Sequence, residues 1–559
     1  MTPGAPPGQL PPYGVEYVDQ DIPQRLAAGV AHGARLTLVN RGSVAWRANS
    51  SEGGAVHLMV SCDGELVAYR PLPRAEVLPG ERIAFHFPLR VTGESGSRTL
   101  RLELVEHEGA RFGERGVPPL ALPVTIGPAP GTASAAAYAI AARINPWYYQ
   151  PTEGIAESRD GRPFPLFVSR AKGCKLWDPE GREYLDYVMG SGSALLGYAD
   201  DRVQLAIKGV LHTAPVTPFP HPLEMDVSRM LCEAFPGAEM IVFGKNGSDV
   251  CTLAARLARL FTGKTTILHC GYHGWQDFWV EQWGFGNCGV PDRSMRLIHG
   301  FRFNDSAGFL ELFQQHRQDL AAVMLEPSGP WGGEAIGLEP DIEQGFLEVV
   351  AGAAREAGAL LVFDEIVTGF RYPKGSVQKA RGIVPDLTCL GKALASGMPL
   401  SALLGRADVF QRALPKAFYC PTFKGEVYSF AAAKASIEIY EREPVAEHVW
   451  NYGVKLARGI DELCGRIGVR AECKGPPFRL GLMFRDADAL RCRAKRTLYQ
   501  QELLKQGVVT FGGLMLPSYA HNDATLVRTL AAVRGALEVV GAAEREDAFD
   551  RYLEIPPLH

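Results

Sequence analysis

One lysine in this 559-residue sequence stands where a reactive amine is expected. Lys392 lies in PDLTCLGKALASGMPLSALLGR, after an apolar strand-like run and Gly391, and before the small, flexible stretch Ala393 to Gly397. Its amine should therefore emerge into a crowded, partly dry space. Desolvation lowers the pKa of a lysine, and Schiff-base chemistry requires a neutral amine. Because a lone lysine of this kind is more often structural or exposed, the motif alone assigns no reaction.

An acidic pair closes a second apolar run. In ALLVFDEIVTGFR the strand-like residues lead directly into Asp364 and Glu365. A carboxylate at this position must find a cation or a hydrogen-bond donor to remain ionised. Asp364 is suited to hold a proton on a ring nitrogen of a ligand. The alternative is a structural salt bridge to Arg371, which lies close in the sequence.

A glycine-serine turn opens a helix after a third apolar run. The segment MIVFGKNGSDVCTLAARLARLF predicts a strand, a turn over 244–248 and a helix with one apolar face. Ser248 is expected to cap this helix. The free N–H groups and the positive dipole end of such a helix suit a phosphate, and an ordinary capped helix is the alternative.

Aromatic residues follow a fourth run. In TTILHCGYHGWQDFW, Tyr272 is expected to form a flat lid for a planar ligand, and His273 to assist by hydrogen bonding. Core packing is the alternative for aromatic residues, and it is the preferred interpretation for Trp275, Phe278 and Trp279.

The elements that must position these residues follow from the alternation of apolar runs with helical patterns. AAVMLEP, a helix over GFLEVVAGAAREAG and then ALLVFDE are one example. This alternation predicts an α/β domain with a largely parallel sheet. Ligands of such sheets bind beyond the carboxyl ends of the strands, where all four candidate sites lie.

The first 128 residues follow a different pattern. Short alternating runs such as ARLTLVN and RIAFHFPLRV, separated by turn clusters, predict an all-β sandwich in which Trp46 packs in the core. We predict a flexible N-terminus over 1–20 and the sandwich over 21–128. A linker is predicted over 129–145, because GPAPGTASAAAYA is rich in Gly, Pro, Ala and Ser.

Composition and motif searches exclude several function classes. The 58 Lys+Arg and 62 Asp+Glu residues give a net charge of -4, which disfavours nucleic-acid binding. No apolar run of about 18 residues is present, so no membrane insertion is expected. Eleven cysteines without a C-x-x-C pair are typical of reduced thiols and predict a cytoplasmic protein. No complete P-loop, zinc-ligand spacing or G-x-S-x-G elbow is found, so no metal site is predicted.

A phosphate cradle, an aromatic plate, a buried acid and a desolvated lysine together specify pyridoxal 5'-phosphate (PLP) as the cofactor. The segments that carry them include FGKNGSDVCTLAARLARLFTGKTTI, GYHGWQD, LEPSGPWGG, LLVFDEIVTGFR, PDLTCLGKALASGMPLSALLGR and PTFKGE. They resemble the class III aminotransferases of fold type I, particularly the branch containing glutamate-1-semialdehyde aminomutase. The resemblance covers 146–559. It implies a large, mostly parallel sheet part over about 216–430 and a small α/β part from 146–215 and 431–559.

The resemblance implies roles for individual residues. Lys392 is expected to form the Schiff base with PLP and to move the proton, and Asp364 to pair with the pyridinium. Ile366 is expected to pack under the cofactor ring opposite Tyr272. Further cofactor contacts are expected from Asn246, Gly247, Ser248, His273 and Glu326. Thr422 of PTFKGE is expected to reach the phosphate of a neighbouring subunit, which implies a homodimer with shared active sites.

Three segments depart from the family pattern. The phosphate turn has Asn246 to Asp249 in place of Ser-Gly-Thr-Glu, and a later turn has Lys424 to Val427 in place of Ser-Gly-Asn-Pro. The substrate-facing Ser-Trp-Gly of the aminomutases is replaced within Gly190 to Ser193, which predicts a wider or more polar pocket. The candidate substrate contacts are Ser191, Ser193, Arg162 and Arg170.

The resemblance implies a transaminase that acts on an amino donor and a carbonyl acceptor. A 2,1-aminomutase needs the same residues and remains an alternative. LVNRGSVAWRA and LELVEHEGARFGERGVPPLALPVTI resemble immunoglobulin-like modules beside bacterial surface-polysaccharide enzymes. GYHGWQD and a polar GSGS segment, with this sandwich in front, resemble relatives from surface-polysaccharide or specialised-metabolite pathways, which suggests a sugar-like or specialised-metabolite carbonyl as substrate. An alternative from another class is a binding or scaffold protein that works through its sandwich.

Overall fold

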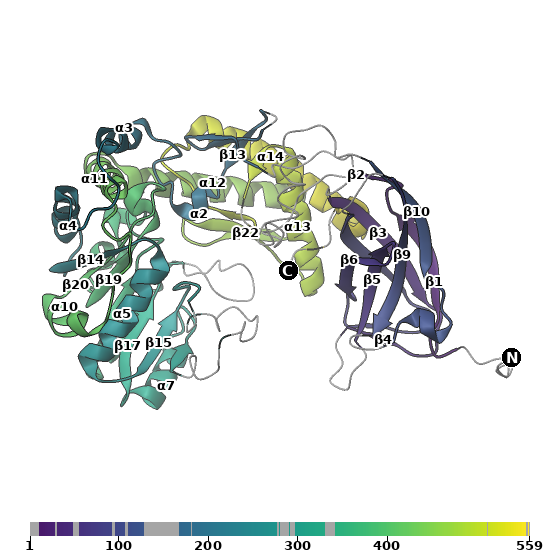
Figure 1. Cartoon of the computed structure of the whole chain (residues 1–559), viewed down its shortest axis with the longest axis horizontal. Helices are drawn as coiled ribbons and strands as arrows, with labels where there is room; N and C mark the ends of the chain where they lie inside the picture. Colours follow the sequence, from purple (N-terminus) through teal and green to yellow (C-terminus); the bar gives the residue numbers. More distant parts are fainter. Residues whose placement is uncertain are drawn as a thin grey trace.

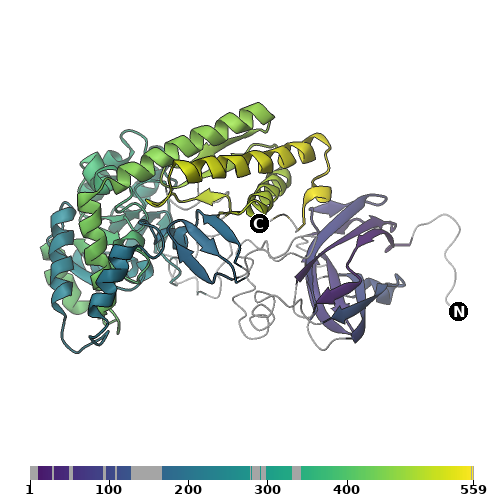
Figure 2. The ribbon, with the colours of Figure 1, turned by 90° about the horizontal axis from the view of Figure 1, so that it is seen from above.

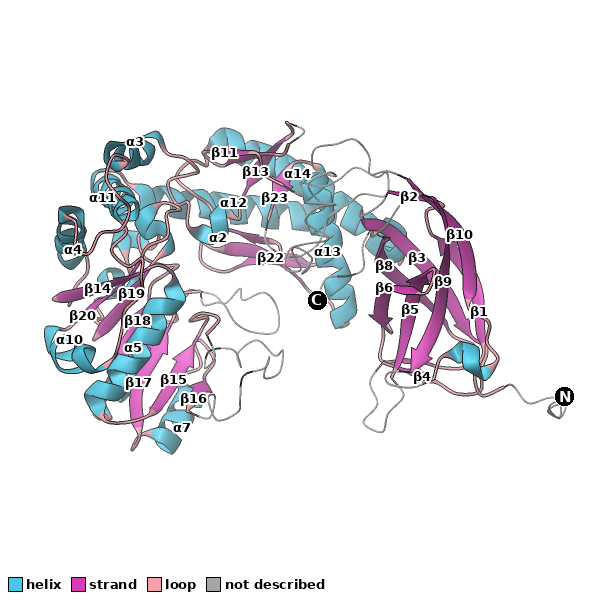
Figure 3. Cartoon of the chain, in the orientation of Figure 1, coloured by secondary structure: helices cyan, strands magenta, loops and turns pink. Residues whose placement is uncertain are grey.

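The computed structural model describes residues 11–27, 31–48, 55–91, 96–106, 110–127, 167–179, 181–276, 279, 290, 297–329, 341–510, 512–554 and 557. Figure 1 shows a strand-rich region, coloured purple, at one end of the chain and a body of helices and strands at the other. The body has one part around a large sheet and another around two small sheets (Figure 3). The predicted all-β region followed by an α/β unit is confirmed.

The N-terminal region consists of two facing sheets. The first contains β1 (Val15–Asp21), β3 (Ala31–Asn40) and β8 (Arg82–Arg90). The second contains, in spatial order, β2 (Arg25–Ala27), β10 (Leu120–Gly127), β9 (Gly96–Glu106), β5 (Val56–Cys62) and β6 (Glu65–Pro71), and a short ribbon pairs β4 (Trp46–Arg47) with β7 (Glu76–Val77). Side chains of β8 are buried alternately, and Leu38, Phe85, Leu58 and Leu102 of the two sheets share one core. The arrangement is a β-sandwich.

Two features of this region bear on the sequence predictions. Trp46 is buried, with its ring edge-on to Phe112 at a centroid distance of 6.3 Å, so its predicted core packing is confirmed. The first strand begins at Val15 and pairs with β3, so the end of the segment 1–20 is a paired strand rather than flexible chain. The predicted linker over 129–145 lies outside the described residues.

The large sheet has seven strands. Their spatial order is β14 (Met240–Gly244), β20 (Ser401–Gly405), β19 (Leu387–Leu390), β18 (Leu360–Asp364), β17 (Leu320–Leu325), β15 (Thr266–Cys270) and β16 (Ile298–Gly300). Only β20 runs antiparallel to its neighbours, which confirms the largely parallel sheet. Every residue of β15, β17, β18 and β19 is buried, as expected for parallel strands covered on both faces.

Helices cover both faces of this sheet. One face packs against α4 (Pro222–Ala234), α7 (Ser306–His316), α8 (Phe346–Glu356) and α11 (Val427–Arg442). The other packs against α5 (Gly247–Thr262) and α10 (Ala407–Ala413). The helix predicted over GFLEVVAGAAREAG is therefore present as α8.

The small part has two sheets and long helices. Its sheets are β11 (Arg170–Lys172), β12 (Lys175–Trp177), β13 (Glu183–Asp186) and β23 (Val508–Val509), and β21 (Ala471–Lys474), β22 (Leu480–Phe484) and β24 (Leu514–Met515). The helices are α12 (Val445–Ile467), α13 (Ala489–Lys505), α14 (Asp523–Arg545) and α15 (Phe549–Tyr552). Leu456, Leu498 and Val533 belong to its separate core.

The two hydrophobic cores do not follow the part boundaries expected at residues 215 and 430. Leu195 and Val203 pack into the larger core, and so do Phe430 and Ile437 of α11 and Val449 of α12. The reason is that α11 presents its apolar side chains to the large-sheet part, so the segments 195–210 and 427–449 join that part.

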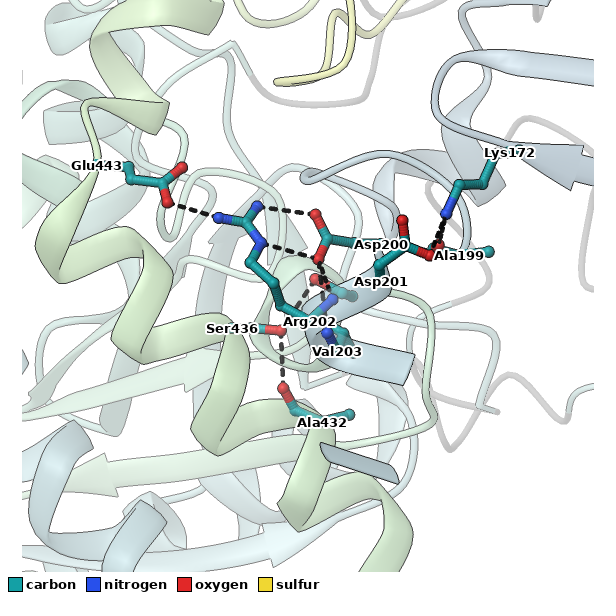
Figure 4. A network of polar contacts seen from close by, with 10 residues as sticks. Lys172, Ala199, Asp200, Asp201, Arg202, Val203, Ala432, Ser436 and Glu443 are labelled. Carbon is teal, nitrogen blue, oxygen red and sulfur yellow. Dashed lines mark hydrogen bonds and ion pairs between the residues drawn. The ribbon is translucent and has the colours of Figure 1, made fainter. Parts of the chain in front are cut away.

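A polar network ties these segments together (Figure 4). Asp200 caps α3 (Asp201–Val210) by accepting from the Arg202 and Val203 N–H groups. The Arg202 guanidinium bonds Asp200 and reaches Glu443, between α11 and α12, at 2.5 Å. The network thus fixes α3 against the junction of the two helices.

The sandwich contacts the C-terminal end of the chain. Viewed from above, α14 extends from the small part toward the sandwich (Figure 2). His86 of β8 lies 3.2 Å from the Asp550 carboxylate of α15, and this contact lowers the pKa of Asp550. A Cβ on Gly33 would lie 2.9 Å from the Glu554 carbonyl oxygen. The sandwich is therefore docked by direct contact with the C-terminal end of the chain.

No helix within the described ranges is long and apolar enough to cross a membrane.

A fully buried lysine stabilises the small part. Lys495 of α13 has no exposed side-chain surface, and its ammonium lies 2.9 Å from Asp486 and 2.6 Å from Glu544. Two carboxylates therefore compensate its desolvated charge. The contact with Lys495 lowers the pKa of Asp486 to about 2.

We predict that Lys495→Met lowers the free energy of unfolding by roughly 3 kcal/mol, because it leaves two poorly solvated carboxylates without their cation. Thermal and denaturant unfolding would measure the loss. Lys505→Met is the matched control, since Lys505 pairs with Glu502 and Glu554 at a position about one-third exposed. Equal effects of both substitutions would contradict the prediction.

Candidate active site

Lys392 begins a short 3-10 turn, η5 (Lys392–Ala395), immediately after β19 and Gly391. Ala393, Leu394 and Ala395 are fully buried, and the Tyr440 hydroxyl donates to the Ala393 carbonyl at 2.7 Å. The stretch expected to be flexible is thus a packed turn, because its small apolar side chains fit into the larger core.

The surroundings of Lys392 change its titration. Burial, and next the positive charge of Arg479, lower the pKa of Lys392 from 10.5 to about 8, and Arg371 acts in the same direction. Glu326 and Asp364 oppose this shift. Desolvation dominates, so the neutral amine is more populated near pH 8 than for an exposed lysine.

Asp364 ends β18, the strand next to β19, and is 2% exposed. Its Oδ2 lies 2.8 Å from Nδ1 of His273 and 3.4 Å from the Cys251 thiol, and its Oδ1 accepts the Ile366 N–H at 3.1 Å. We assign the Nδ1 proton to His273, so that it donates to the carboxylate. These three contacts fix the orientation of the carboxylate.

The alternative salt bridge from Asp364 to Arg371 is not formed. Arg371 is 1% exposed and instead donates to the Val367 carbonyl at 3.1 Å and to the Gly192 carbonyl. The negative charge of Asp364 is therefore left to its smaller donors, His273 and Cys251, and to a ligand.

The helix cap after β14 is Asn246 rather than Ser248. The Asn246 side chain accepts the Asp249 N–H at 3.1 Å, and the Asp249 carboxylate accepts the Asn246 N–H at 3.1 Å, which forms a capping box. The prediction of Ser248 as cap was wrong because Asn246 has the extended backbone of an N-cap. Ser248 instead lies in the first turn, with Gly247, where N–H groups precede the hydrogen bonds of the helix itself.

Gly247 leaves room for the Ile366 side chain against this turn. A Cβ there would lie 2.5 Å from Cδ1 of Ile366, and Ile366 also lies beside Gly391. Ile366 therefore stands between the turn and Lys392, where the resemblance places it under a cofactor ring.

Lys245 links the turn to α11. Its ammonium lies 3.0 Å from Glu426, which caps α11 by accepting the Tyr428 and Ser429 N–H groups. The departure at Lys424 to Val427 thus buries Glu426 as a cap, while Lys424 stays exposed.

The aromatic segment divides between surface and core. Tyr272 is 37% exposed, Trp275 is 72% exposed and Trp279 is buried. Core packing is confirmed for Trp279 and wrong for Trp275, because the chain turns outward at Gly274, whose φ is 122° and whose Cβ position is blocked by Ser248. Phe278 lies outside the described residues.

Glu326 anchors this segment after β17. Its Oε1 accepts the Tyr272 N–H at 2.8 Å, and its Oε2 lies 3.0 Å from Arg479. Both side chains of the ion pair are about 2–3% exposed. Glu326 therefore orders the Tyr272 backbone and compensates a buried guanidinium.

The remaining candidates lie in several places. Ser191 is exposed in α2 (Met189–Gly192), and the Ser193 hydroxyl donates to the Gly190 carbonyl at 2.8 Å. Arg170 is exposed on β11, with its guanidinium 4.5 Å from the Trp177 ring centroid, and is not among the charges that shift Lys392. Thr422 is exposed before α11, and Arg162 lies outside the described residues.

Three buried residues of the site were not nominated from the sequence. Cys251 is one of many apolar residues of α5, and Arg479 follows two prolines in a segment without a motif. Arg371 was considered only as a partner of Asp364. Only Arg371 had a local sequence feature that could have identified it, because it lies close in the sequence to Asp364. That feature predicted a salt bridge to Asp364, which is not formed.

The comparisons define the class of protein. The sequence model of the class-III aminotransferases matches residues 156–281 and 301–512, so the chain belongs to this family. It is 32% identical over 385 residues to the 3-aminobutyryl-CoA aminotransferase of Cloacimonas acidaminovorans (strain Evry), covering 67% of this chain and 90% of that relative. It is 33% identical over 396 residues to the glutamate-1-semialdehyde 2,1-aminomutase of Desulforudis audaxviator (strain MP104C), covering 66% and 90%.

A solved structure supports the same class. The PLP internal aldimine form of the FumI protein of Sphingopyxis sp. MTA144 has a TM-score of 0.67 and 27% sequence identity, covering 75% of this chain and 97% of that one. The chain is thus an enzyme of fold type I, a transaminase or an aminomutase, and its cofactor is PLP. The residues fit PLP, since the low-pKa Lys392 and the buried Asp364 stand at the ends of neighbouring parallel strands, and Ile366 lies against both Gly391 and Gly247 at the N-terminus of α5.

We predict that Lys392 of the cofactor-free protein titrates with a midpoint near pH 8, because burial disfavours its charged form. With that pKa, roughly a tenth of the amine is neutral at pH 7. Competitive acylation between pH 6 and 10, with peptide mass spectrometry, would measure the titration, and exposed Lys379 is the comparison in the same digest. A midpoint of Lys392 above pH 10 would contradict the prediction.

Proposed function

We propose that this enzyme is an aminotransferase that moves an amino group from an amine or amino-acid donor to an aldehyde or ketone. The observation that carries the proposal is the arrangement of Lys392 and Asp364 at the ends of neighbouring parallel strands, with the Lys392 pKa lowered to about 8. When bound, PLP supplies a carbonyl that accepts the amino group and a ring that accepts electrons.

The residues of this chain have distinct roles in the proposal. The neutral amine of Lys392 would hold the cofactor at its carbonyl carbon, and its Nζ would otherwise hold and move a proton. Asp364, hydrogen-bonded to His273 and Cys251, would accept a hydrogen bond from the ring nitrogen. Tyr272 and Ile366 would cover opposite faces of the cofactor ring and exclude water from them.

The phosphate end uses the first turn of α5. The Gly247 and Ser248 N–H groups and the helix dipole hold the phosphate, while Asn246 fixes the turn through its capping box. Lys245 and Glu426 tie this turn to α11. Ser191 and Ser193 face the substrate, which fits a polar, hydroxylated carbonyl compound.

Similar proteins with different names support two reactions. One is named an aminotransferase and another a 2,1-aminomutase, at nearly equal identity. Aminomutation is therefore the second candidate. No disulfide joins the ten cysteines of the described ranges, which supports the prediction of a reducing, cytoplasmic compartment. The sandwich is proposed to be an immunoglobulin-like module with a binding role.

We predict that single amino donors convert the enzyme stoichiometrically to its pyridoxamine form with release of a keto product. Absorbance spectra and product analysis would show both. An aminomutase would instead return the nitrogen to its substrate, so isomerisation without release of a keto product would overturn transamination.

Lys392→Ala should abolish turnover and the borohydride-reducible cofactor adduct, and a retained adduct would contradict the role of Lys392.

A homodimer with shared sites is part of the proposal. Thr422 is exposed. Two nearby residues in the sequence have largely exposed aromatic side chains, Phe418 at 90% and Phe423 at 58%, and Phe219 of the same part of the chain is 80% exposed. Exposed aromatic residues of this size are typical of protein interfaces.

We predict that Phe423→Asp shifts the protein from dimer to monomer and weakens PLP binding at least tenfold, because Thr422 then no longer reaches a partner's phosphate. Sedimentation velocity and equilibrium dialysis would measure the two effects. Val527→Asp, on α14 with 69% exposure, is the matched control and should change neither. A dimeric Phe423→Asp protein with ordinary PLP affinity would refute the shared site.

A further inference from the structure

The polar turn α2 has an unusual backbone. Met189, Gly190, Ser191 and Gly192 have φ values of 49°, 58°, 54° and 82°, so four successive residues are left-handed. Two of them are not glycine, and L-residues rarely adopt this conformation. Such a turn persists only where surrounding contacts hold it.

The first half of the turn has several such contacts. Asp186 accepts the Val188 N–H at 2.9 Å and the Met189 N–H at 2.8 Å. The Tyr198 hydroxyl donates to Asp186 at 2.7 Å and accepts the Gly190 N–H at 2.6 Å. These bonds all lie on the side of β13, before Ser191.

The second half of the turn meets Arg371. The guanidinium donates to the Gly192 carbonyl, and a Cβ on Gly192 would lie 3.5 Å from Nη2. Arg371 also donates to the Val367 carbonyl at 3.1 Å, so it joins the turn to the segment that follows β18. In the described chain Arg371 forms no ion pair, and its Nε has no hydrogen-bond partner. A fully buried cation is therefore used to bind backbone oxygens.

This contact lies beside the reactive amine. The turn α2 packs against η5, which begins at Lys392, and Arg371 is one of the charges that act on Lys392. Figure 1 shows α2 at the junction of the large-sheet part and the small part. Ser191 and Gly190 are exposed there, whereas Gly192 is buried.

We propose that Arg371 is a positioning residue for the substrate: it ties the Gly192 carbonyl of the left-handed turn to the end of β18 and so fixes where Ser191 stands relative to Lys392. This inference deepens the proposed function and rests on it for its catalytic consequence. The buried guanidinium suits the task because its planar fork reaches two carbonyls at once, which a lysine ammonium cannot reproduce.

Hydrogen exchange tests the positioning without any assumption about the reaction. In the wild-type holoenzyme the Gly192, Ser193 and Ala194 amides, which bond Val188, Gly190 and Met189, should be protected. Arg371→Lys should speed their exchange at least tenfold and leave the β18 amides unchanged. Unprotected amides in the wild type, or equal exchange in the variant, would overturn the proposal, and the wild-type measurement suffices where the variant does not fold.

Kinetics test the consequence for substrate binding. Arg371→Lys should raise the KM of an amino donor about tenfold and keep kcat within about twofold, with the cofactor spectrum unchanged. Ser191→Ala should raise KM as well, and the double variant should match Arg371→Lys, because both act through Ser191. Arg381→Lys is the matched control, since Arg381 contacts Asp341 and Tyr372 instead.

The outcomes separate the two hypotheses. A lower kcat at constant KM, or independent multiplication of the two single effects, would overturn the positioning role. No turnover of any donor by the wild type, together with protected turn amides, would refute the proposed function and leave the structural contact of Arg371 intact.

Discussion

The parallel pairing of β18 and β19 is the constraint on which the catalytic region depends. Asp364 is the last residue of β18 and lies opposite Cys389 in the register, and Lys392 follows three residues later. Both side chains therefore emerge at the same edge of the sheet, one strand spacing apart. Because β17 is parallel to β18, Glu326 reaches the same edge.

Burial at this edge makes the placement of charge critical. Lys392, Arg371 and Arg479 are cations with little access to water, and the nearby acids are Glu326 and Asp364. Glu326 compensates Arg479 directly, whereas Arg371 is satisfied by carbonyl dipoles. This distribution leaves Asp364 available for the cofactor, and the charges of Arg479 and Arg371 add to burial in lowering the Lys392 pKa. The chemistry of the site thus depends on which buried charges are paired with each other.

The rest of the chain supports this edge from outside. The turn α2 packs against η5, and α11 packs behind η5, where Tyr440 donates to the Ala393 carbonyl. The contacts described above join the sandwich to the C-terminal end of the chain, through His86 with Asp550 of α15 and through Gly33 beside the Glu554 carbonyl. In Figure 1 the sandwich lies at the opposite end of the molecule from the large sheet. This position agrees with a role outside the catalytic reaction.

The sequence by itself determined the two-region architecture, the parallel sheet and the nomination of Lys392 and Asp364, because apolar runs followed by single polar residues are local patterns. It misplaced the cap at Ser248 and the packing of Trp275, since both depend on the exact path of a turn. Only the tertiary structure decided the partners of Arg371 and Arg479. Arg371 contacts Gly192, which is 179 residues away in the sequence, and Arg479 contacts Glu326, which is 153 residues away. Long-range pairing of buried charges leaves no local pattern, and it decides the electrostatics of the site.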